Sequence, residues 1–127
     1  MDREKPLSSL EDVLACFKFI RNKKQEYFVC LSLDSRGCLI ARRTVTIGTL
    51  TASLVHPREM FAGPLKDRAA AVTIAHNHPS GIPEPSKSDI AVTQQLVAAG
   101  QILGIPLRDH IIVTAREEYS FQYHGLI

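Results

Sequence analysis

Two histidines and an aspartate near the middle of the chain have the residue types and the spacing of a metal site. His76 and His78 end a short apolar segment, residues 69–75, that predicts a buried strand. Side chains at i and i+2 of a strand point to the same side, so the two imidazoles are expected side by side. Asp89 closes residues 86–89, whose Ser-x-x-acid pattern is typical of a helix start. The two imidazoles and this carboxylate can therefore converge on one point.

The ligand types favour zinc in a catalytic setting. A single buried histidine is more often a hydrogen-bonded core residue, but a His-x-His pair followed by an aspartate combines three ligands that suit zinc. Two histidines and a carboxylate also hold iron in non-haem oxygenases, so iron stays an alternative. The absence of cysteine ligands from the cluster argues against a closed structural zinc site. Three protein ligands leave the fourth tetrahedral position for water, which is the catalytic arrangement.

Ser86 and Asp89 also admit a simpler reading, in which they only form the capping box of a helix. For Ser86 the two roles are compatible, because its backbone can start the helix while its hydroxyl faces the metal water. For Asp89 they compete, since a carboxylate that turns back to a backbone N–H is less free to bind a metal.

The rest of the sequence predicts the elements that must position this cluster. Helices are expected over residues 10–20 and 87–103, with a further helix from Pro57 that Gly63-Pro64 should interrupt. Strands are expected over residues 27–33, 38–47, 69–75, 107–114 and 119–123. Helices and strands are interspersed, which predicts one α/β or α+β domain across residues 1–127, with a mixed central sheet and a frayed stretch over residues 1–8.

Composition narrows the class of protein. The chain has 127 residues and a formal charge of +2, with 15 Lys and Arg against 13 Asp and Glu. The longest basic runs are the pairs Lys23-Lys24 and Arg42-Arg43, which predict solvated surface rather than a nucleic-acid stripe. No signal peptide and no apolar run of membrane-spanning length is seen, so a cytoplasmic protein is expected. The three cysteines, which have no Cys-x-x-Cys spacing, are expected as small core residues: Cys16, Cys30 and Cys38.

The central motif resembles that of a known enzyme family. His-x-His, seven residues, then Ser-x-x-Asp is the motif of the JAMM (JAB/MPN) metallopeptidases, and it is present here with its spacing intact. The string over residues 76–89, with His-Asn-His-Pro-Ser-Gly and Pro-Ser-x-x-Asp, looks like the RadC family in particular. The similarity covers roughly residues 10–127. One departure is that residues 1–20 do not resemble the helix-hairpin-helix region that RadC proteins usually carry.

The resemblance implies a fold and a set of roles. It implies a cytidine-deaminase-like three-layer α/β/α domain that holds zinc (Zn2+) through His76, His78 and Asp89. It also implies that a glutamate next to the first strand is the general acid/base, by position Glu26, and that Ser86 stabilises the oxyanion.

Other glutamates could take the general-base role. Glu26 follows the basic residues 21–24 and could be a surface salt-bridge residue, which leaves Glu59 and Glu84 as rivals.

Three functions are weighed on this basis. The first is a zinc-dependent hydrolase of peptide or isopeptide bonds, acting on an unknown protein or peptide. The second is a DNA-repair-associated protein acting on or near nucleic acid, a label that the family carries but that the residues support poorly, so nucleic-acid binding is expected to be weak at most. The third is a catalytically silent, zinc-stabilised module that binds protein. No membrane partner is expected.

Overall fold

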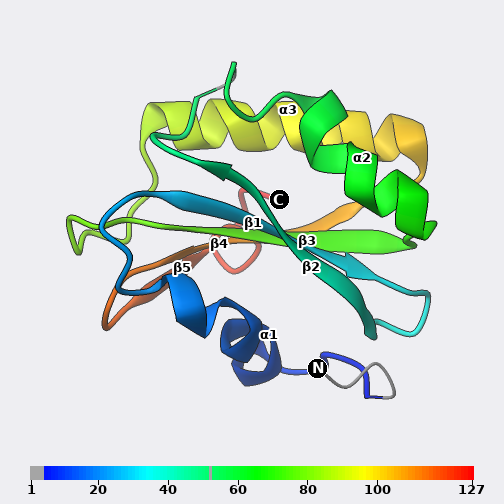
Figure 1. Ribbon diagram of the computed structural model, residues 1–127, viewed down its shortest axis with the longest axis horizontal. Coiled ribbons are helices and arrows are strands. Elements are labelled where there is room, and N and C mark those ends of the chain that lie inside the picture. The colour runs from blue at the N-terminus through cyan, green and yellow to red at the C-terminus, as the bar shows by residue number, and fades with distance from the viewer. Residues whose placement is uncertain (1–4, 52) are drawn as a thin grey trace.

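A mixed five-stranded sheet with helices on both faces forms the structure, a computed structural model that describes residues 5–51 and 53–127 (Figure 1). In chain order the elements are α1 (Leu10–Phe17), the 3-10 helix η1 (Lys18–Ile20), β1 (Tyr27–Leu33), β2 (Leu39–Ile47), α2 (Pro57–Asp67), β3 (Ala71–Asn77), α3 (Lys87–Leu103), β4 (Leu107–Val113) and β5 (Glu118–Ser120). This arrangement confirms the predicted α/β class with a mixed sheet.

The strand order β2-β1-β3-β4-β5 places β3 at the centre of the sheet. Strands β3 and β4 are parallel, and the other neighbouring pairs are antiparallel. A parallel pair needs a crossover, which α3 supplies on the same face as α2, while α1 covers the opposite face (Figure 1). The last residues of β3 and the first turn of α3 consequently meet at one end of the sheet.

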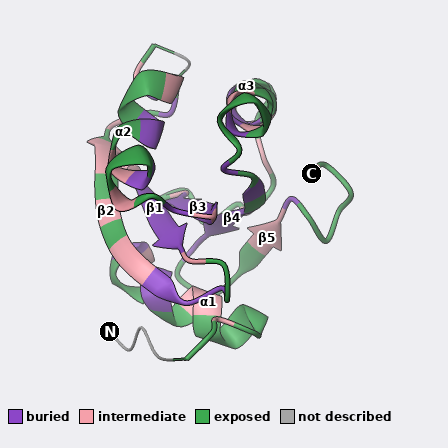
Figure 2. Ribbon diagram, turned by 90° about the vertical axis from the view of Figure 1, so that its right-hand side faces the viewer, coloured by how far each residue is buried: buried purple, intermediate pink, exposed green. Residues whose placement is uncertain are grey.

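Two apolar layers hold the helices to the sheet. Helices α2 and α3 pack on a layer that includes Phe28, Phe61, Ile74 and Leu96, all buried. Helix α1 packs on the opposite layer, and strands β1, β3 and β4 are buried between the two (Figure 2). Burial of apolar surface on both faces is the main force that fixes the ends of these strands.

Helix α2 departs from the prediction, because it runs through Gly63 and Pro64 without interruption. Pro64 lies in the last turn, and packing of the buried Met60 and Phe61 outweighs the local cost of the proline. The glycine has a packing role, since a Cβ atom at Gly63 would lie 2.6 Å from Nη1 of Arg43.

The two ends of the chain also differ from the prediction. Residues 1–4 of the stretch expected to fray lie outside the described part, but Pro6 is bridged to Cys38 and Leu7 donates its N–H to Gly37 at 2.9 Å. The last strand is shorter than predicted and ends at Ser120, because a turn follows it.

The prediction for the cysteines is confirmed. The three cysteines are buried free thiols, as their apolar surroundings predicted. In the part of the chain that the structure describes, no helix is long and apolar enough to cross a membrane.

Candidate metal centre

The predicted histidine pair lies at the carboxyl end of the central strand. His76 is fully buried in β3, paired with Phe28 of β1 and Ile112 of β4. His78 follows one residue after the strand ends and is held in line with it, because its N–H donates to the carbonyl of Val113 at 3.0 Å. The sheet thus fixes the backbone of both histidines, and their side chains share the face that α3 covers.

The side chains of His76, His78 and Asp89 converge on one point. The Nε2 atoms of the two histidines are 3.0 Å apart. The Oδ2 atom of Asp89 lies 3.1 Å from Nε2 of His78, and its Oδ1 atom lies 3.4 Å from Nε2 of His76. The fold therefore brings together the three residues that the sequence singled out as ligands.

Hydrogen bonding on the far side of His78 shows what its Nε2 atom offers to the cluster. Its Nδ1 atom is 2.7 Å from the carbonyl oxygen of Ile82, and a carbonyl can only accept, so Nδ1 carries the proton. A neutral His78 then presents an unprotonated Nε2 to the carboxylate of Asp89. Two acceptors 3.1 Å apart repel each other unless a positive charge lies between them, either a second proton on His78, whose pKa this contact raises, or a metal ion. The donor set therefore fits a metal ion.

The pKa directions agree with a site built for positive charge. Burial alone would raise the pKa of the Asp89 carboxyl, but its contacts with His76 and His78 outweigh burial and hold that pKa far below its usual range. Burial alone would lower the pKa of His78, but hydrogen bonds to Asp89 and to the carbonyl of Ile82 raise it above the ordinary value. For His110, which lies behind His76, burial dominates and lowers the pKa well below the ordinary value, so this imidazole is neutral.

Asp89 caps its helix and faces the histidines at the same time. Its Oδ2 atom accepts the N–H of Ser86 at 2.9 Å, and the Oγ atom of Ser86 accepts the N–H of Asp89 at 3.0 Å. The same oxygen of Asp89 makes the cap and the contact with His78, which is possible because a carboxylate offers about four acceptor positions. The hydroxyl of Ser86 accepts here, so its own hydrogen can still be donated into the cleft.

Glu26 lies beside the histidines, in the half-buried position just before β1. A carboxylate oxygen of Glu26 and a ring nitrogen of each of His76 and His78 all lie within 4.8 Å of one another. The carbonyl of Glu26 accepts the N–H of Gly48 at 2.8 Å, which ties this segment to the end of β2.

The rival glutamates lie away from the histidines. Glu59 is exposed in α2, where it pairs with Arg58 at 3.9 Å, and Glu84 is exposed in the loop before α3. Among the described residues, Glu26 is the glutamate that joins the histidine cluster.

Asn77 supports the Glu26 segment, a role that sequence reasoning missed. Its side chain is fully buried on the face of β3 opposite to His76. Its Oδ1 atom accepts the N–H of Tyr27 at 2.7 Å, and its Nδ2 atom donates to the carbonyls of Lys23 and Gln25 at 3.2 and 3.0 Å. One side chain thus satisfies three backbone groups on both sides of Glu26. A polar residue between two histidines in a buried strand is the signal that could have revealed it.

Thr93 and His110 form a second layer behind His76 that the sequence analysis also missed. The Nδ1 atom of His76 is 2.7 Å from Nε2 of His110, whose Nδ1 atom is 2.6 Å from Oγ1 of Thr93. Thr93 lies one helical turn after Asp89, so the i, i+4 spacing could have placed it near the site. Nothing in the pattern of β4 marked His110.

A cleft opens over these groups. It has a volume of about 400 Å³ and is lined mainly by hydroxyl-bearing and ionisable side chains, among them Glu26, Thr49, Thr51, His78, Ser86 and Asp89. A second depression shares Glu26, Thr49 and Pro79 with it and continues on the side of Lys24 and Gln25. The two depressions therefore adjoin at Glu26, Thr49 and Pro79.

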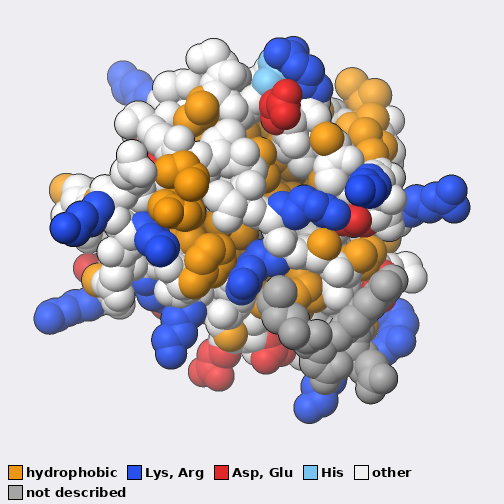
Figure 3. All heavy atoms as spheres, in the orientation of Figure 1, with side chains coloured by type: hydrophobic (Ala, Val, Ile, Leu, Met, Phe, Trp, Pro, Cys, Tyr) orange, Lys and Arg blue, Asp and Glu red, His pale blue; other side chains and the backbone are white. Residues whose placement is uncertain are grey.

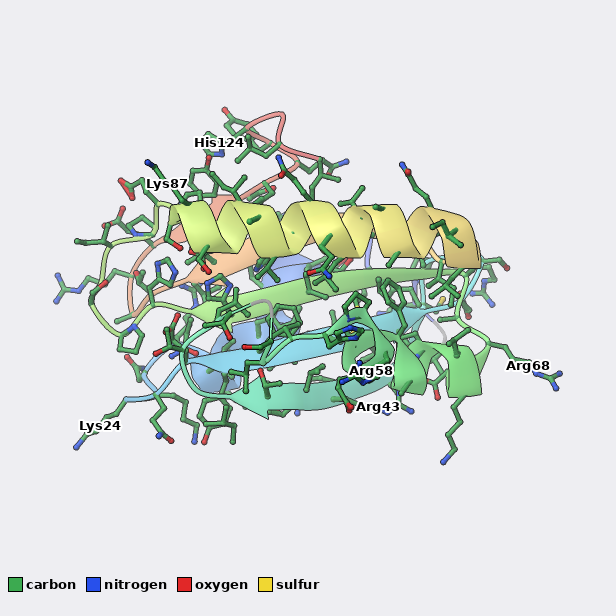
Figure 4. The ribbon with its side chains drawn as sticks, turned by 90° about the horizontal axis from the view of Figure 1, so that it is seen from above. Lys24, Arg43, Arg58, Arg68, Lys87 and His124 are labelled. Atoms are coloured by element: carbon green, nitrogen blue, oxygen red, sulfur yellow. The ribbon has the colours of Figure 1, made fainter. Side chains whose placement is uncertain are left out.

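The basic pairs do not gather into one patch. Arg43 forms a two-point ion pair with Asp67, in which its Nη2 atom is 2.7 Å from Oδ1. Arg42 lies over the ring of Phe19, and Figure 4 shows Lys24 far from Arg43. On the face shown in Figure 3, lysines and arginines are dispersed among other side chains rather than aligned in a stripe.

Comparison with known proteins finds a family model and several proteins that are similar to this chain. The family model described as "RadC-like JAB domain" matches residues 7–126. A UPF0758 protein of Methanospirillum hungatei is 50% identical over 108 residues, which are 85% of this chain and 48% of that protein. A UPF0758 protein of Bacillus licheniformis is 48% identical over 108 residues, with the same shares, and one of Methanosarcina mazei is 41% identical over 125 residues, which are 98% of this chain and 55% of that protein. The chain therefore spans about half the length of the curated relatives it matches.

Proposed function

Because this chain belongs to the RadC-like JAB domain family, we propose that it is a zinc-dependent hydrolase of peptide or isopeptide bonds. The observation that carries the proposal is the convergence of His76, His78 and Asp89, whose facing atoms lie 3.0 to 3.4 Å apart. The finer description of the fold as cytidine-deaminase-like belongs to the same proposal. It is supported by the mixed sheet with helices on both faces.

In this proposal His76, His78 and Asp89 hold the zinc. Two imidazoles and one carboxylate are a common catalytic set, which leaves one coordination position open. Zinc bound there supplies Lewis acidity, which makes water nucleophilic near neutral pH and polarises a carbonyl group. The capping box that fixes Asp89 and the strand that fixes His76 keep the ligand geometry rigid before any metal arrives.

Glu26 is proposed as the general base and Ser86 as the donor to the oxyanion. Glu26 is half-buried at the edge of the cleft, within 4.8 Å of the histidine nitrogens, so its carboxylate can accept a proton there and later pass it to the leaving nitrogen. The hydroxyl of Ser86 opens into the same cleft and can donate to the oxygen on which negative charge develops.

The substrate is proposed to be an extended polypeptide segment. The two depressions that meet at Glu26, Thr49 and Pro79 provide room on each side of the proposed base. Hydroxyl groups, one buried leucine and the carboxylates of Glu26 and Asp89 line the larger depression, as suits backbone amides and small side chains better than a phosphate backbone.

The test is a hydrolysis screen on the zinc-loaded protein. Fluorogenic peptides and isopeptide-linked lysine substrates are offered in one arm, and single- and double-stranded DNA in another. We expect peptide or isopeptide cleavage that falls by about 100-fold or more in Glu26→Gln, because general-base catalysis contributes roughly 10²–10⁴. Glu84→Gln is the matched control and should retain activity, since Glu84 is exposed in the loop before α3.

Two results would contradict the proposal. Cleavage of DNA without cleavage of any peptide bond would favour the repair-associated alternative. Peptide cleavage that is equal in the wild type and in Glu26→Gln would remove the proposed mechanism.

A further inference from the structure

We propose that Thr93 and His110 set the tautomer of His76, so that its Nε2 atom is left without a proton and ready to bind a metal. The two residues act as positioning residues behind the metal site. The inference rests on the proposed zinc site for its purpose, but the tautomers themselves are a property of the metal-free protein.

The first step is the direction of the hydrogen bond that Thr93 makes in its own helix. Its Oγ1 atom lies 2.7 Å from the main-chain carbonyl oxygen of Asp89, one turn earlier in α3. A carbonyl oxygen can only accept, so the hydroxyl of Thr93 donates its single hydrogen to Asp89.

The second step follows because Thr93 has already donated its hydroxyl hydrogen to Asp89. Oγ1 of Thr93 is also 2.6 Å from Nδ1 of His110. The hydroxyl has no second hydrogen to give, so it must accept, and Nδ1 of His110 must carry the proton.

The third step determines which nitrogen of His110 accepts a hydrogen bond from His76. This residue is fully buried, and its ring stacks on Phe121 with a centroid distance of 4.5 Å, an environment that disfavours a charged imidazole. A neutral imidazole has one N–H, so Nε2 of His110 is an acceptor. Nδ1 of His76, which lies 2.7 Å from that atom, therefore donates.

The hydrogen bonds from Thr93 through His110 to His76 therefore fix which nitrogen of each imidazole carries a proton. With its proton held on Nδ1, His76 presents a bare Nε2 toward His78 and Asp89. The chain of hydrogen bonds begins at the main chain of Asp89 and ends at a nitrogen that faces the side chain of Asp89. The same helical turn thus positions a carboxylate ligand and selects the proton state of its neighbouring imidazole.

The test replaces Thr93 by valine, which has nearly the same shape but cannot accept a hydrogen bond. In Thr93→Val a proton on Nδ1 of His110 has no acceptor, which favours the other tautomer of His110. That tautomer donates to His76 and drives the proton of His76 onto Nε2. Thr93→Ser keeps the hydroxyl and should behave as the wild type.

The first readout is the tautomer state of the metal-free protein, measured by long-range ¹⁵N–¹H NMR of the histidine side chains. We expect Nδ1–H on both His76 and His110 in the wild type and in Thr93→Ser, and loss of this pattern in Thr93→Val. Nε2–H on His76 in the wild type, or an unchanged pattern in Thr93→Val, would overturn the inference.

The second readout is zinc affinity, measured by competition with a chelating dye. Loss of an outer partner of a metal-binding histidine typically weakens metal binding by about 10–100-fold, and we expect a loss in this range for Thr93→Val. Thr73→Val, in the buried part of β3, is the matched control and should keep the wild-type affinity. Equal affinity in Thr93→Val and Thr73→Val would show that the tautomer of His76 does not prepare the site for zinc, which would overturn that part of the inference.

The tautomer inference and the proposed function can be contradicted independently of each other. A wild-type protein that takes up no zinc would remove the proposed function, and the NMR pattern of the metal-free protein would still decide the tautomers. If Thr93→Val fails to fold, Thr93→Ala removes the same acceptor without adding a branched side chain.

Discussion

The Oδ2 atom of Asp89 lies 3.1 Å from the Nε2 atom of His78, and the same oxygen accepts the backbone N–H of Ser86 in the capping box of α3. A helix start and a candidate metal ligand therefore share one carboxylate. The cap orients the side chain before a metal is bound, and the parallel crossover from β3 to β4 brings that cap to the histidines.

The two roles of Asp89 can be separated by Asp89→Asn. An amide oxygen can still cap the helix, so the free energy of unfolding of the metal-free protein should change by no more than about 1 kcal/mol. The loss of the charge should weaken zinc binding by about 100-fold or more, beyond the loss typical of an outer partner. Urea unfolding and zinc competition measure the two effects.

The capping box of α1 offers a matched control. Asp12 closes that box with Ser9 in the same way. Asp12→Asn should change stability to a similar extent and leave zinc affinity unchanged. If both variants lost zinc equally, the effect of Asp89→Asn would be one of folding rather than of ligation.

Removal of the Asn77 side chain should loosen the segment that carries Glu26. Asn77→Ala deletes three hydrogen bonds to backbone groups, and at about 0.5–1.5 kcal/mol each we expect a loss of roughly 2–4 kcal/mol in the free energy of unfolding. Hydrogen exchange at the Tyr27 amide should become faster, because its acceptor is gone. Asn22→Ala, at an exposed site nearby, should change stability by less than about 0.5 kcal/mol. An unchanged Tyr27 exchange rate would contradict the role given to Asn77.

The ion pair between Arg43 and Asp67 predicts a pH-dependent part of stability. The hydrogen bonds from Arg43 lower the pKa of Asp67 below its ordinary value. A lowered folded-state pKa gives stability that is fully present above the unfolded pKa of about 3.9 and is lost as pH falls through the folded value. The wild type should therefore exceed Asp67→Asn by about 1 kcal/mol at neutral pH, and the difference should shrink below about pH 4.

Urea unfolding of both proteins between about pH 7 and pH 3 measures this difference. Glu11→Gln serves as a surface control with a small effect. A gap between the wild type and Asp67→Asn that widened on acidification would contradict the sign.

Local patterns predicted most of the fold because they coincide with the forces that hold it. The nearly continuous apolar run over residues 27–33 and the capping sequence before Lys87 each specify a local structure that packing then reinforces. The helix through Gly63-Pro64 was predicted wrongly, because tertiary packing of buried neighbours decided it rather than local propensity.

In the candidate site, too, only the residues that a local pattern specifies could be predicted. His76, His78 and Asp89 could be identified because their spacing along the chain already reports their geometry. His110 could not be identified, because its position next to His76 depends on the parallel pairing of β3 and β4, which no local pattern specifies.

Weak binding of DNA is expected for this chain. Arg43 is paired with Asp67, and the 15 Lys and Arg of the chain are offset by 13 Asp and Glu, so a stripe of unopposed cations that could neutralise phosphates is not expected. We expect a salt slope of no more than about three to four and a dissociation constant no better than roughly 10⁻⁴–10⁻⁶ M, without sequence preference. Fluorescence anisotropy at about 150 mM salt measures it. Nanomolar affinity, or a clear preference for damaged or branched DNA, would promote the repair-associated alternative.

The most direct test of the central claim is the zinc content of the purified protein, measured by elemental analysis of the wild type, His78→Ala and His124→Ala. His124 is exposed near the end of the chain, so its removal controls for the loss of a histidine elsewhere. We predict about one zinc per chain in the wild type and in His124→Ala, and little zinc in His78→Ala, because the metal needs the converging imidazoles. Sub-stoichiometric zinc in the wild type that His78→Ala leaves unchanged would contradict the account.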